Sequence, residues 1–152
     1  MTSSPLIIEL TNTPDPAEKA TIAEAMLAYN ETFLGGPDSK PLAVLVKSPD
    51  VVGGVWGRTS HQWLFIEMLY LPENLRGRHL GQQLLHLAER EARGRGCVGA
   101  WLDTFSEPAR RFYERQGYEP FGQLNDYPPG HTRVFLRRSF APQVKCPNTD
   151  SP

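Results

Sequence analysis

The chain has 152 residues, of which 39% are hydrophobic and 22% charged, and its formal net charge is −1. This length and composition are those of a globular domain with a hydrophobic core. A near-neutral charge gives no bias toward nucleic acid or an anionic membrane, and no apolar run is long enough to span a bilayer, so we expect neither partner.

Cysteine usage and the termini set further bounds. Cys97 lies in an apolar segment and Cys146 in a polar, proline-containing tail, which argues against a disulfide, and no spacing of ligand residues predicts a metal site. No basic segment precedes the first apolar run, so no signal peptide is predicted. We therefore expect a cytoplasmic protein with one domain over residues 1–140 and a flexible tail over 141–152.

Hydrophobic periodicity and turn residues predict alternating strands and helices. In chain order the expected elements are a strand at 6–10, a helix at about 17–31, strands at 42–47, 51–58 and 63–71, a helix between Gly81 and Gly94, a strand at 97–104, a helix between Ser106 and Gly117, and strands at 118–124 and 131–138. Asp15 and Ser106 are typical N-cap residues. Gly57 in the third strand indicates a bulge or a close backbone approach.

This order predicts an α/β fold with a mixed, mostly antiparallel central sheet and flanking helices. The segment from 63 to 104 is long enough for a parallel strand–helix–strand crossover. Its first strand is nearly continuous in apolar residues, so we expect both of its faces to be covered. In the following helix, Leu84, Leu87, Ala88 and Ala92 form the expected buried stripe, with Glu89 outside it.

The loop between residues 71 and 81 combines basic side chains with glycines. It reads Arg76-Gly-Arg-His-Leu-Gly81, it follows the apolar strand, and it opens the amphipathic helix. Backbone N–H groups and a helix N-terminus there favour an anion, which we interpret as a cofactor pyrophosphate. The alternative is a solvated basic turn. Neither a P-loop nor a Rossmann glycine pattern is present.

Two motifs resemble those of the GNAT acetyltransferases. Arg76-x-x-x-x-Gly81 resembles motif A, and Ala109-Arg-Arg-Phe-Tyr-Glu-Arg-Gln-Gly-Tyr118 resembles motif B, with Phe112 and Tyr113 in the expected places. The resemblance covers roughly residues 44–138. It implies a GNAT-like acyl-CoA N-acyltransferase fold and the use of acetyl-CoA.

The resemblance also implies which residues bind the cofactor. The loop and the start of the helix would hold pyrophosphate, and the backbone of Leu69 and Leu71 would pair with the pantetheine arm as an added strand does. The expected cofactor residues are Leu69, Tyr70, Leu71, Arg76, Gly77, Arg78, His79, Leu80, Gly81, Gln82, Thr104, Ser106, Ala109, Phe112, Tyr113 and Arg115.

Two positions depart from the family pattern. His79 stands where motif A has glycine, and a positive φ there would cost histidine on the order of 1 kcal/mol, although its imidazole could also bind a phosphate. Ser106 stands where motif B is preceded by an asparagine that contacts the cofactor, and its hydroxyl can do part of that work.

Two residues are the catalytic candidates. In the family, the tyrosine that matches Tyr113 often protonates the leaving thiolate, whereas the structural alternative is an aromatic on the packing face. Glu67 is a candidate general base, because desolvation in an apolar strand raises the pKa of a carboxyl toward the useful range. Its alternative is a salt-bridged glutamate, and Glu24, Glu31 and Asp103 are weaker candidates.

The acceptor site is expected to draw on residues outside the two motifs. Candidates are Tyr29, Trp63, Asp103, Asp126, Tyr127 and His131. The loop at 126–131 is equally well explained as a hairpin turn, and core packing is an alternative for Trp63.

We expect transfer of an acetyl group to a primary amine of a small molecule, such as an antibiotic, in a ternary complex. A protein or peptide N-terminus is the alternative acceptor, and a non-catalytic CoA-binding module and a nucleotide-phosphate binder are rival functions. The sequence leaves the oligomeric state open, and a homodimer is one candidate because the family is often dimeric.

Overall fold

The computed structural model describes residues 3–140 and divides into two compact units, the first ending at Pro37 and the second beginning at Asp38. The expected flexible tail over 141–152, including Cys146, lies outside the described residues. The single domain expected over residues 1–140 stays a prediction, and each unit is described by itself.

The first unit contains one helix, α1 (Pro16–Leu34). As expected, Asp15 caps it and Pro16 opens it. The cap is a reciprocal box, in which the Ala17 N–H donates to Asp15 Oδ1 over 2.9 Å and the Asp15 N–H donates to Glu18 Oε2 over 3.0 Å. The strand predicted at residues 6–10 is wrong, because this unit offers no strand with which it could pair.

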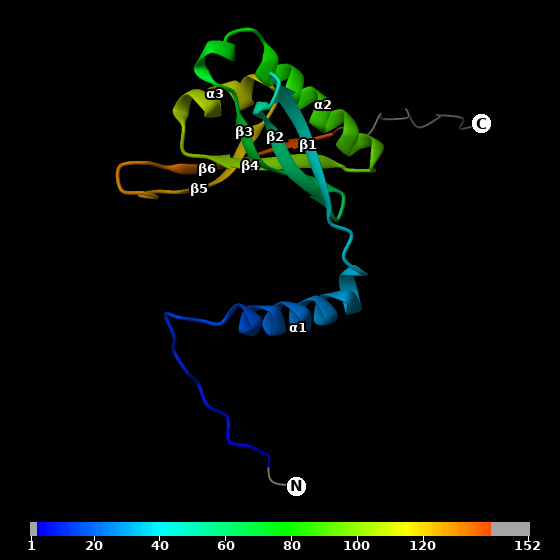
Figure 1. Ribbon diagram of the computed structural model, residues 1–152, viewed down its shortest axis with the longest axis vertical. Helices are drawn as coiled ribbons and strands as arrows, with labels where there is room; N and C mark the ends of the chain where they lie inside the picture. Colours follow the sequence, from blue (N-terminus) through cyan, green and yellow to red (C-terminus); the bar gives the residue numbers. More distant parts are fainter. Residues whose placement is uncertain (1–2, 141–152) are drawn as a thin grey trace, which may run out of the picture. The chain divides into compact units, whose positions relative to one another are not determined.

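The second unit is a six-stranded sheet with two helices and a short 3₁₀ turn (Figure 1). Its elements are β1 (Lys40–Lys47), β2 (Val51–Ser60), β3 (Trp63–Tyr70), the 3₁₀ turn at Glu73–Leu75, α2 (Leu80–Gly94), β4 (Gly99–Thr104), α3 (Glu107–Arg115), β5 (Glu119–Leu124) and β6 (Arg133–Ser139). The strand order is β1-β2-β3-β4-β6-β5.

Every neighbouring pair of strands is antiparallel except β3 and β4, which are parallel and are connected through α2. The predicted mixed sheet and its crossover are therefore confirmed. Among the described residues, no helix has the length and apolar character needed to cross a membrane.

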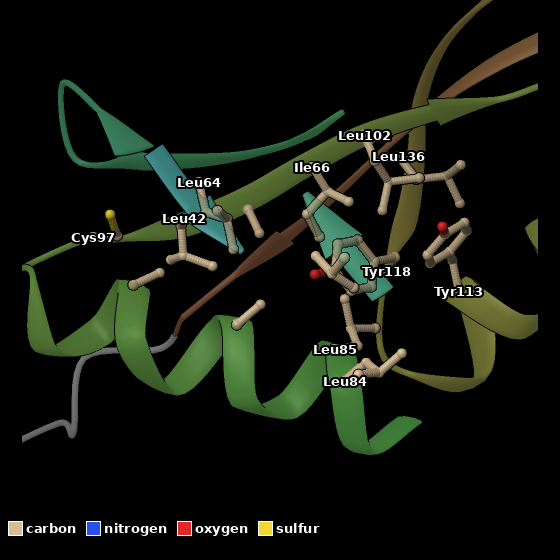
Figure 2. Packing of buried hydrophobic residues seen from close by; sticks show 14 of the residues in the cluster. Leu42, Leu64, Ile66, Leu84, Leu85, Cys97, Leu102, Tyr113, Tyr118 and Leu136 are labelled. Carbon is tan, nitrogen blue, oxygen red and sulfur yellow. The ribbon is translucent and has the colours of Figure 1, made fainter. Parts of the chain in front are cut away.

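Helices α2 and α3 pack on one face of the sheet, and the core lies between these helices and the sheet (Figures 1 and 2). From the sheet, Leu64 and Leu136 are fully buried, and from α2, Leu85 is fully buried. The predicted stripe of α2 is correct for Leu84, Ala88 and Ala92. It is wrong for Leu87, whose residue is 44% exposed.

The opposite face of the sheet is called the outer face. On it, Phe65 of β3 stacks on Trp101 of β4 with ring centroids 4.0 Å apart. Met68 and Tyr70 of β3 are 59% and 57% exposed. Within the described part of the second unit, therefore, no element covers the outer face of the second half of β3, where coverage on both faces was expected.

A β-bulge at Glu67 explains why the pattern of buried residues changes along β3. Trp56 of β2 pairs with Met68, but the next residue of β2, Gly57, pairs with Ile66, so Glu67 is the extra residue. Ile66 is buried before the bulge and Leu71 after it, so the alternation of buried positions shifts by one residue. A side chain at Gly57 would overlap the carbonyl of Phe65, which confirms the close approach expected there.

Glu89 of α2 is buried, contrary to the expectation that it lies outside the stripe. Arg138 of β6 donates from Nη1 to both its oxygens, over 3.1 and 2.9 Å, and the Tyr118 hydroxyl donates to Oε2 over 3.4 Å. Desolvation raises the pKa of Glu89, and the Arg138 charge partly offsets this rise. Burial, together with the Glu89 charge, also raises the pKa of Tyr118.

Arg138→Met is expected to lower the free energy of unfolding by about 3 kcal/mol at neutral pH, because it leaves a buried carboxylate unpaired. Since the folded-state pKa of Glu89 is above its ordinary value of 4.5, the charged carboxyl is the disfavoured form. The contribution of Glu89 to stability is therefore full below that value and is lost as the pH rises through the raised pKa.

Urea denaturation across the acidic and neutral range tests this prediction. The deficit of Arg138→Met should shrink at acidic pH, and the exposed neighbour variant Arg137→Met should cost less than about 1 kcal/mol. A deficit that is independent of pH would contradict the assigned role of Glu89.

Candidate active site

The N-terminus of α2 lacks a side-chain cap, which sets it apart from the other two helices of the described chain. Asp15 caps α1, and the Ser106 hydroxyl caps α3 by accepting from the Ala109 N–H over 3.3 Å. At α2 the N-cap residue is His79, and its side chain makes no cap hydrogen bond. The first N–H groups of α2 are therefore open to an anion.

The loop before α2 is shaped by two residues in the left-handed region. Gly77 has φ 78° and His79 has φ 58°. Glycine adopts this conformation freely, but a histidine does so at a cost of roughly 1 kcal/mol. Arg76 ties the loop to the end of β3, since its Nε donates to the Leu71 carbonyl over 2.9 Å. That carbonyl therefore already accepts one hydrogen bond, in a residue whose backbone the resemblance implied would pair with a pantetheine arm.

The segments that carry the two sequence motifs lie close together at Gly81. A Cβ at this position would lie 3.4 Å from Phe112 of α3 and 3.8 Å from a methyl carbon of Leu71. These are ordinary van der Waals distances, so the first turn of α2 lies beside α3 and the end of β3 at this point. Ala109 and Leu80 pack partly against the same core. Thr104 ends β4, and its Oγ1 accepts from the Ser106 N–H over 3.1 Å.

Strands β3 and β4 separate before they reach this loop. They pair only from Trp63 with Gly99 to Phe65 with Trp101. Beyond that point β4 continues to pair with β6 as far as Thr104. The edge of β3 that faces β4 therefore has no strand partner from Ile66 onward, within the described residues. An extended ligand can add to such an edge by backbone hydrogen bonds, as the resemblance implied.

Tyr113 of α3 lies beside Leu136 and Tyr118 (Figure 2), and its residue is 7% exposed. Its ring centroid is 5.8 Å from that of Tyr118. Burial, and to a smaller degree the charge of Asp103, raises the pKa of Tyr113 to about 12. The phenol is therefore protonated throughout the physiological range, although its proton is given up with less driving force than that of an exposed phenol.

Glu67, the bulge residue, forms an ion pair with Arg58 of β2. The Arg58 guanidinium also lies over the ring of Phe65, 4.8 Å from its centroid, which places this pair on the outer face. The side chain of Glu67 is 30% exposed. The salt-bridged alternative therefore describes the observed contact of Glu67, and its role as a base stays a prediction.

Asp103, near the end of β4, forms a second acid–arginine pair on the outer face. Arg133 of β6 donates from Nε to Asp103 Oδ1 over 2.8 Å. Tyr127 stacks on Phe105 with centroids 5.7 Å apart, and the Arg133 guanidinium lies over both rings. The structure therefore brings together Asp103 and Tyr127, two of the expected acceptor residues.

The remaining predicted residues lie outside the loop before α2 and outside the unpaired edge of β3. Asp126 and His131 belong to the turn between β5 and β6, where the Tyr127 N–H donates to the His131 carbonyl over 3.0 Å. Trp63 packs against Gly99 at the start of β3, the end of the strand away from the loop. Arg115 is exposed in the last turn of α3. Tyr29 belongs to α1 in the first unit, where it contacts Phe33.

A hollow of about 440 Å³ lies beside the uncapped helix end. Its lining is mostly basic and amide side chains, namely Arg78, His79, Gln82, Gln83, His86, Leu87 and Arg90. Open N–H groups, this basic lining and the unpaired edge of β3 together fit a ligand with a phosphorylated end and an extended arm.

Sequence reasoning missed two features of the site. The bulge at Glu67 leaves no mark in the residue types of β3, and Gly57 on the neighbouring strand was the available signal. Arg133 was missed because its two partners, Asp103 and Tyr127, come from other segments of the chain.

Comparison with known proteins is informative at both the sequence and the fold level. Residues 7–118 match the family model described as "Acetyltransferase (GNAT) family". The chain is 39% identical over 126 residues to acetyltransferase Atu2258 of Agrobacterium fabrum, covering 82% of this chain and 91% of that protein. It is 38% identical over 88 residues to the blasticidin-S acetyltransferase of Streptomyces morookaense, covering 57% and 65%.

The fold has a near match among solved structures. A crystal structure from Agrobacterium tumefaciens, assigned as an acetyltransferase, superposes with a TM-score of 0.83 at 34% sequence identity. The match covers 89% of this chain and the whole of the other.

His79→Gly is expected to raise the free energy of unfolding by roughly 0.5–1 kcal/mol, because relief of the left-handed strain exceeds the added entropy of the unfolded chain. Urea denaturation measures the change, and His86→Gly, a substitution inside α2, should destabilise by about 1 kcal/mol. Equal destabilisation by both substitutions would contradict strain at His79.

Proposed function

The chain belongs to the GNAT family of acetyltransferases, and on that premise we propose that it moves an acetyl group from acetyl-CoA to a primary amine of a small molecule by direct transfer in a ternary complex. The uncapped N-terminus of α2, beside the open edge of β3, is the observation that carries this proposal.

The cofactor residues named from the sequence would bind different parts of acetyl-CoA. The N–H groups of Leu80, Gly81 and Gln82, with Arg78, would hold the pyrophosphate. The edge of β3 around Leu69 would align the pantetheine arm. The splayed end of β4, near Thr104, leaves room for that arm between the strands.

Acetyl-CoA supplies the acetyl group as a thioester, and the residues of this chain handle the protons. Glu67 accepts a proton from the acceptor amine, directly or through a water, so that nitrogen can form its bond to the carbonyl carbon. Tyr113 donates its phenolic proton to the sulfur as the carbon–sulfur bond breaks. A backbone N–H of β3 stabilises the charge on the carbonyl oxygen. No covalent enzyme intermediate is required.

The proposed acceptor is a small basic molecule, with an antibiotic as the leading candidate. The name of the blasticidin-S acetyltransferase supports this choice, since 88 residues of this chain align with it. Transfer to a protein or peptide N-terminus is the alternative. A cytoplasmic location and a homodimer stay predictions.

A CoA-release assay over a panel of amines, with mass spectrometry of the products, tests the proposal. At least one small amine should gain the mass of an acetyl group. Tight CoA binding without turnover on any small amine or peptide would instead support a non-catalytic module. A melting temperature raised by ATP but not by CoA would support a nucleotide-phosphate binder.

Tyr113→Phe should lower kcat at least tenfold, because the leaving thiolate loses its proton donor, while the affinity for acetyl-CoA stays intact. Steady-state kinetics and calorimetric titration measure the two quantities. Tyr118→Phe, which removes a hydroxyl from the same buried cluster, serves as the control. An unchanged kcat in Tyr113→Phe would remove this residue as the acid.

Glu67→Gln should lower kcat/KM at least tenfold across the pH profile, because the amide cannot accept the amine proton. The profile of kcat/KM is recorded for wild type, for Glu67→Gln and for Glu91→Gln, whose exposed carboxylate pairs with Arg95 on α2. Superimposable profiles for wild type and Glu67→Gln would reject Glu67 as the base.

A further inference from the structure

The pair formed by Asp103 and Arg133 is asymmetric. Arg133 Nε and Nη2 both reach the same carboxylate oxygen, Oδ1, each at 2.8 Å. A guanidinium facing a carboxylate commonly binds one oxygen with each nitrogen. Here both nitrogens approach a single oxygen, and Nε donates a hydrogen bond to it.

Arg133 is itself fixed by aromatic side chains. Its guanidinium lies over the rings of Phe105, Tyr127 and Phe135, at 5.3, 5.2 and 5.4 Å from their centroids. These contacts lie within the range of cation–π attraction. The rings come from the β4–α3 connection, the β5–β6 turn and β6, so three separate segments hold one side chain in place.

The second carboxylate oxygen of Asp103 is left free. Both contacts to Arg133 are made by Oδ1, and no hydrogen bond within the described residues uses Oδ2. Among those residues, no buried side-chain oxygen or nitrogen lacks a partner. Oδ2 is therefore reached by solvent, although the Asp103 side chain as a whole is only 15% exposed.

Asp103 lies in the half of β4 that has separated from β3. Asp103 is two residues beyond Trp101, the last residue of β4 that pairs with β3. Trp101 and Phe65 form a stacked aromatic floor on the same face. The charge of Asp103 also contributes to the raised pKa of Tyr113, so the two groups interact electrostatically.

We propose that Arg133 is a positioning residue that holds Asp103 by Oδ1 so that Oδ2 binds a cationic group of the acceptor, and that this contact selects acceptors carrying a second basic group besides the amine that reacts. This inference rests on the proposed function and names the class of its substrate. A charge-assisted hydrogen bond in a partly buried setting is strong enough to discriminate between such acceptors.

The test compares two acceptors of equal length. Both carry one primary amine, and the other end is either a dimethylamino group, which stays cationic and cannot form an amide, or a hydroxyl. The ratio of their kcat/KM values defines the charge preference. Wild type should favour the cationic acceptor, and Asp103→Asn should lower this preference at least about tenfold, through KM of the cationic acceptor. The KM for acetyl-CoA should not change.

Arg133 is tested with two substitutions. Arg133→Met should lose the preference as Asp103→Asn does, because the freed carboxylate is no longer oriented, and Arg133→Lys should restore part of it. The matched controls are Glu119→Gln and Arg137→Met. They disrupt a different acid–arginine pair, which joins Glu119 of β5 to Arg137 of β6. In this pair Arg137 Nε lies 3.6 Å from Glu119, and the Arg137 guanidinium lies over the ring of Phe121.

Each outcome separates the two proposals. Failure of wild type to acetylate any amine overturns the proposed function itself. Transfer with no charge preference, or with a preference that survives in Asp103→Asn, overturns the role of Asp103. A preference that stays unchanged or increases in Arg133→Met shows that Arg133 merely neutralises the carboxylate, which overturns its positioning role.

Discussion

The separation of β3 from β4 is the constraint on which the site depends. The strands pair over only three residues of each, whereas β4 pairs with β6 on its other edge along its whole length. A parallel crossover requires a helix between its strands, and that helix, α2, starts beyond the end of β3 where the gap is open. The unpaired strand edge and the uncapped helix end are therefore products of one topology, and the family's cofactor is both extended and phosphorylated.

The two faces of the sheet differ in how they use charge. On the helix side, Glu89 is buried and is satisfied by Arg138 and a tyrosine hydroxyl. On the outer face, Glu67 and Asp103 each pair with an arginine that rests on aromatic rings. In the pairs of the second kind, each carboxylate keeps some exposure, since the side chains of Glu67 and Asp103 are 30% and 15% exposed. Tyr113, buried among apolar side chains, provides the contrasting neutral group.

Local sequence signals predicted the elements well because caps and periodicity act within a few residues. Asp15 and Ser106 begin helices where expected, and the loop from Arg76 to Gly81 lies between β3 and α2. Contacts between residues far apart in the sequence could not be predicted from such local signals. The burial of Glu89 depends on Arg138, 49 residues later in the chain, and the clamp on Asp103 depends on Arg133, 30 residues later. The apolar run at residues 6–10 shows the reverse failure, since strand propensity forms no strand without a partner.

The bulge at Glu67 fixes the length of the chain between the core and the loop that begins at Arg76. Side chains before it, such as Leu64, and after it, such as Leu71, both reach the core only because one extra residue separates the two halves of the strand. Removing any one residue between them would turn Leu71 away from the core and swing the Arg76 loop out of register with α2. This strand can therefore change its side chains but not its residue count.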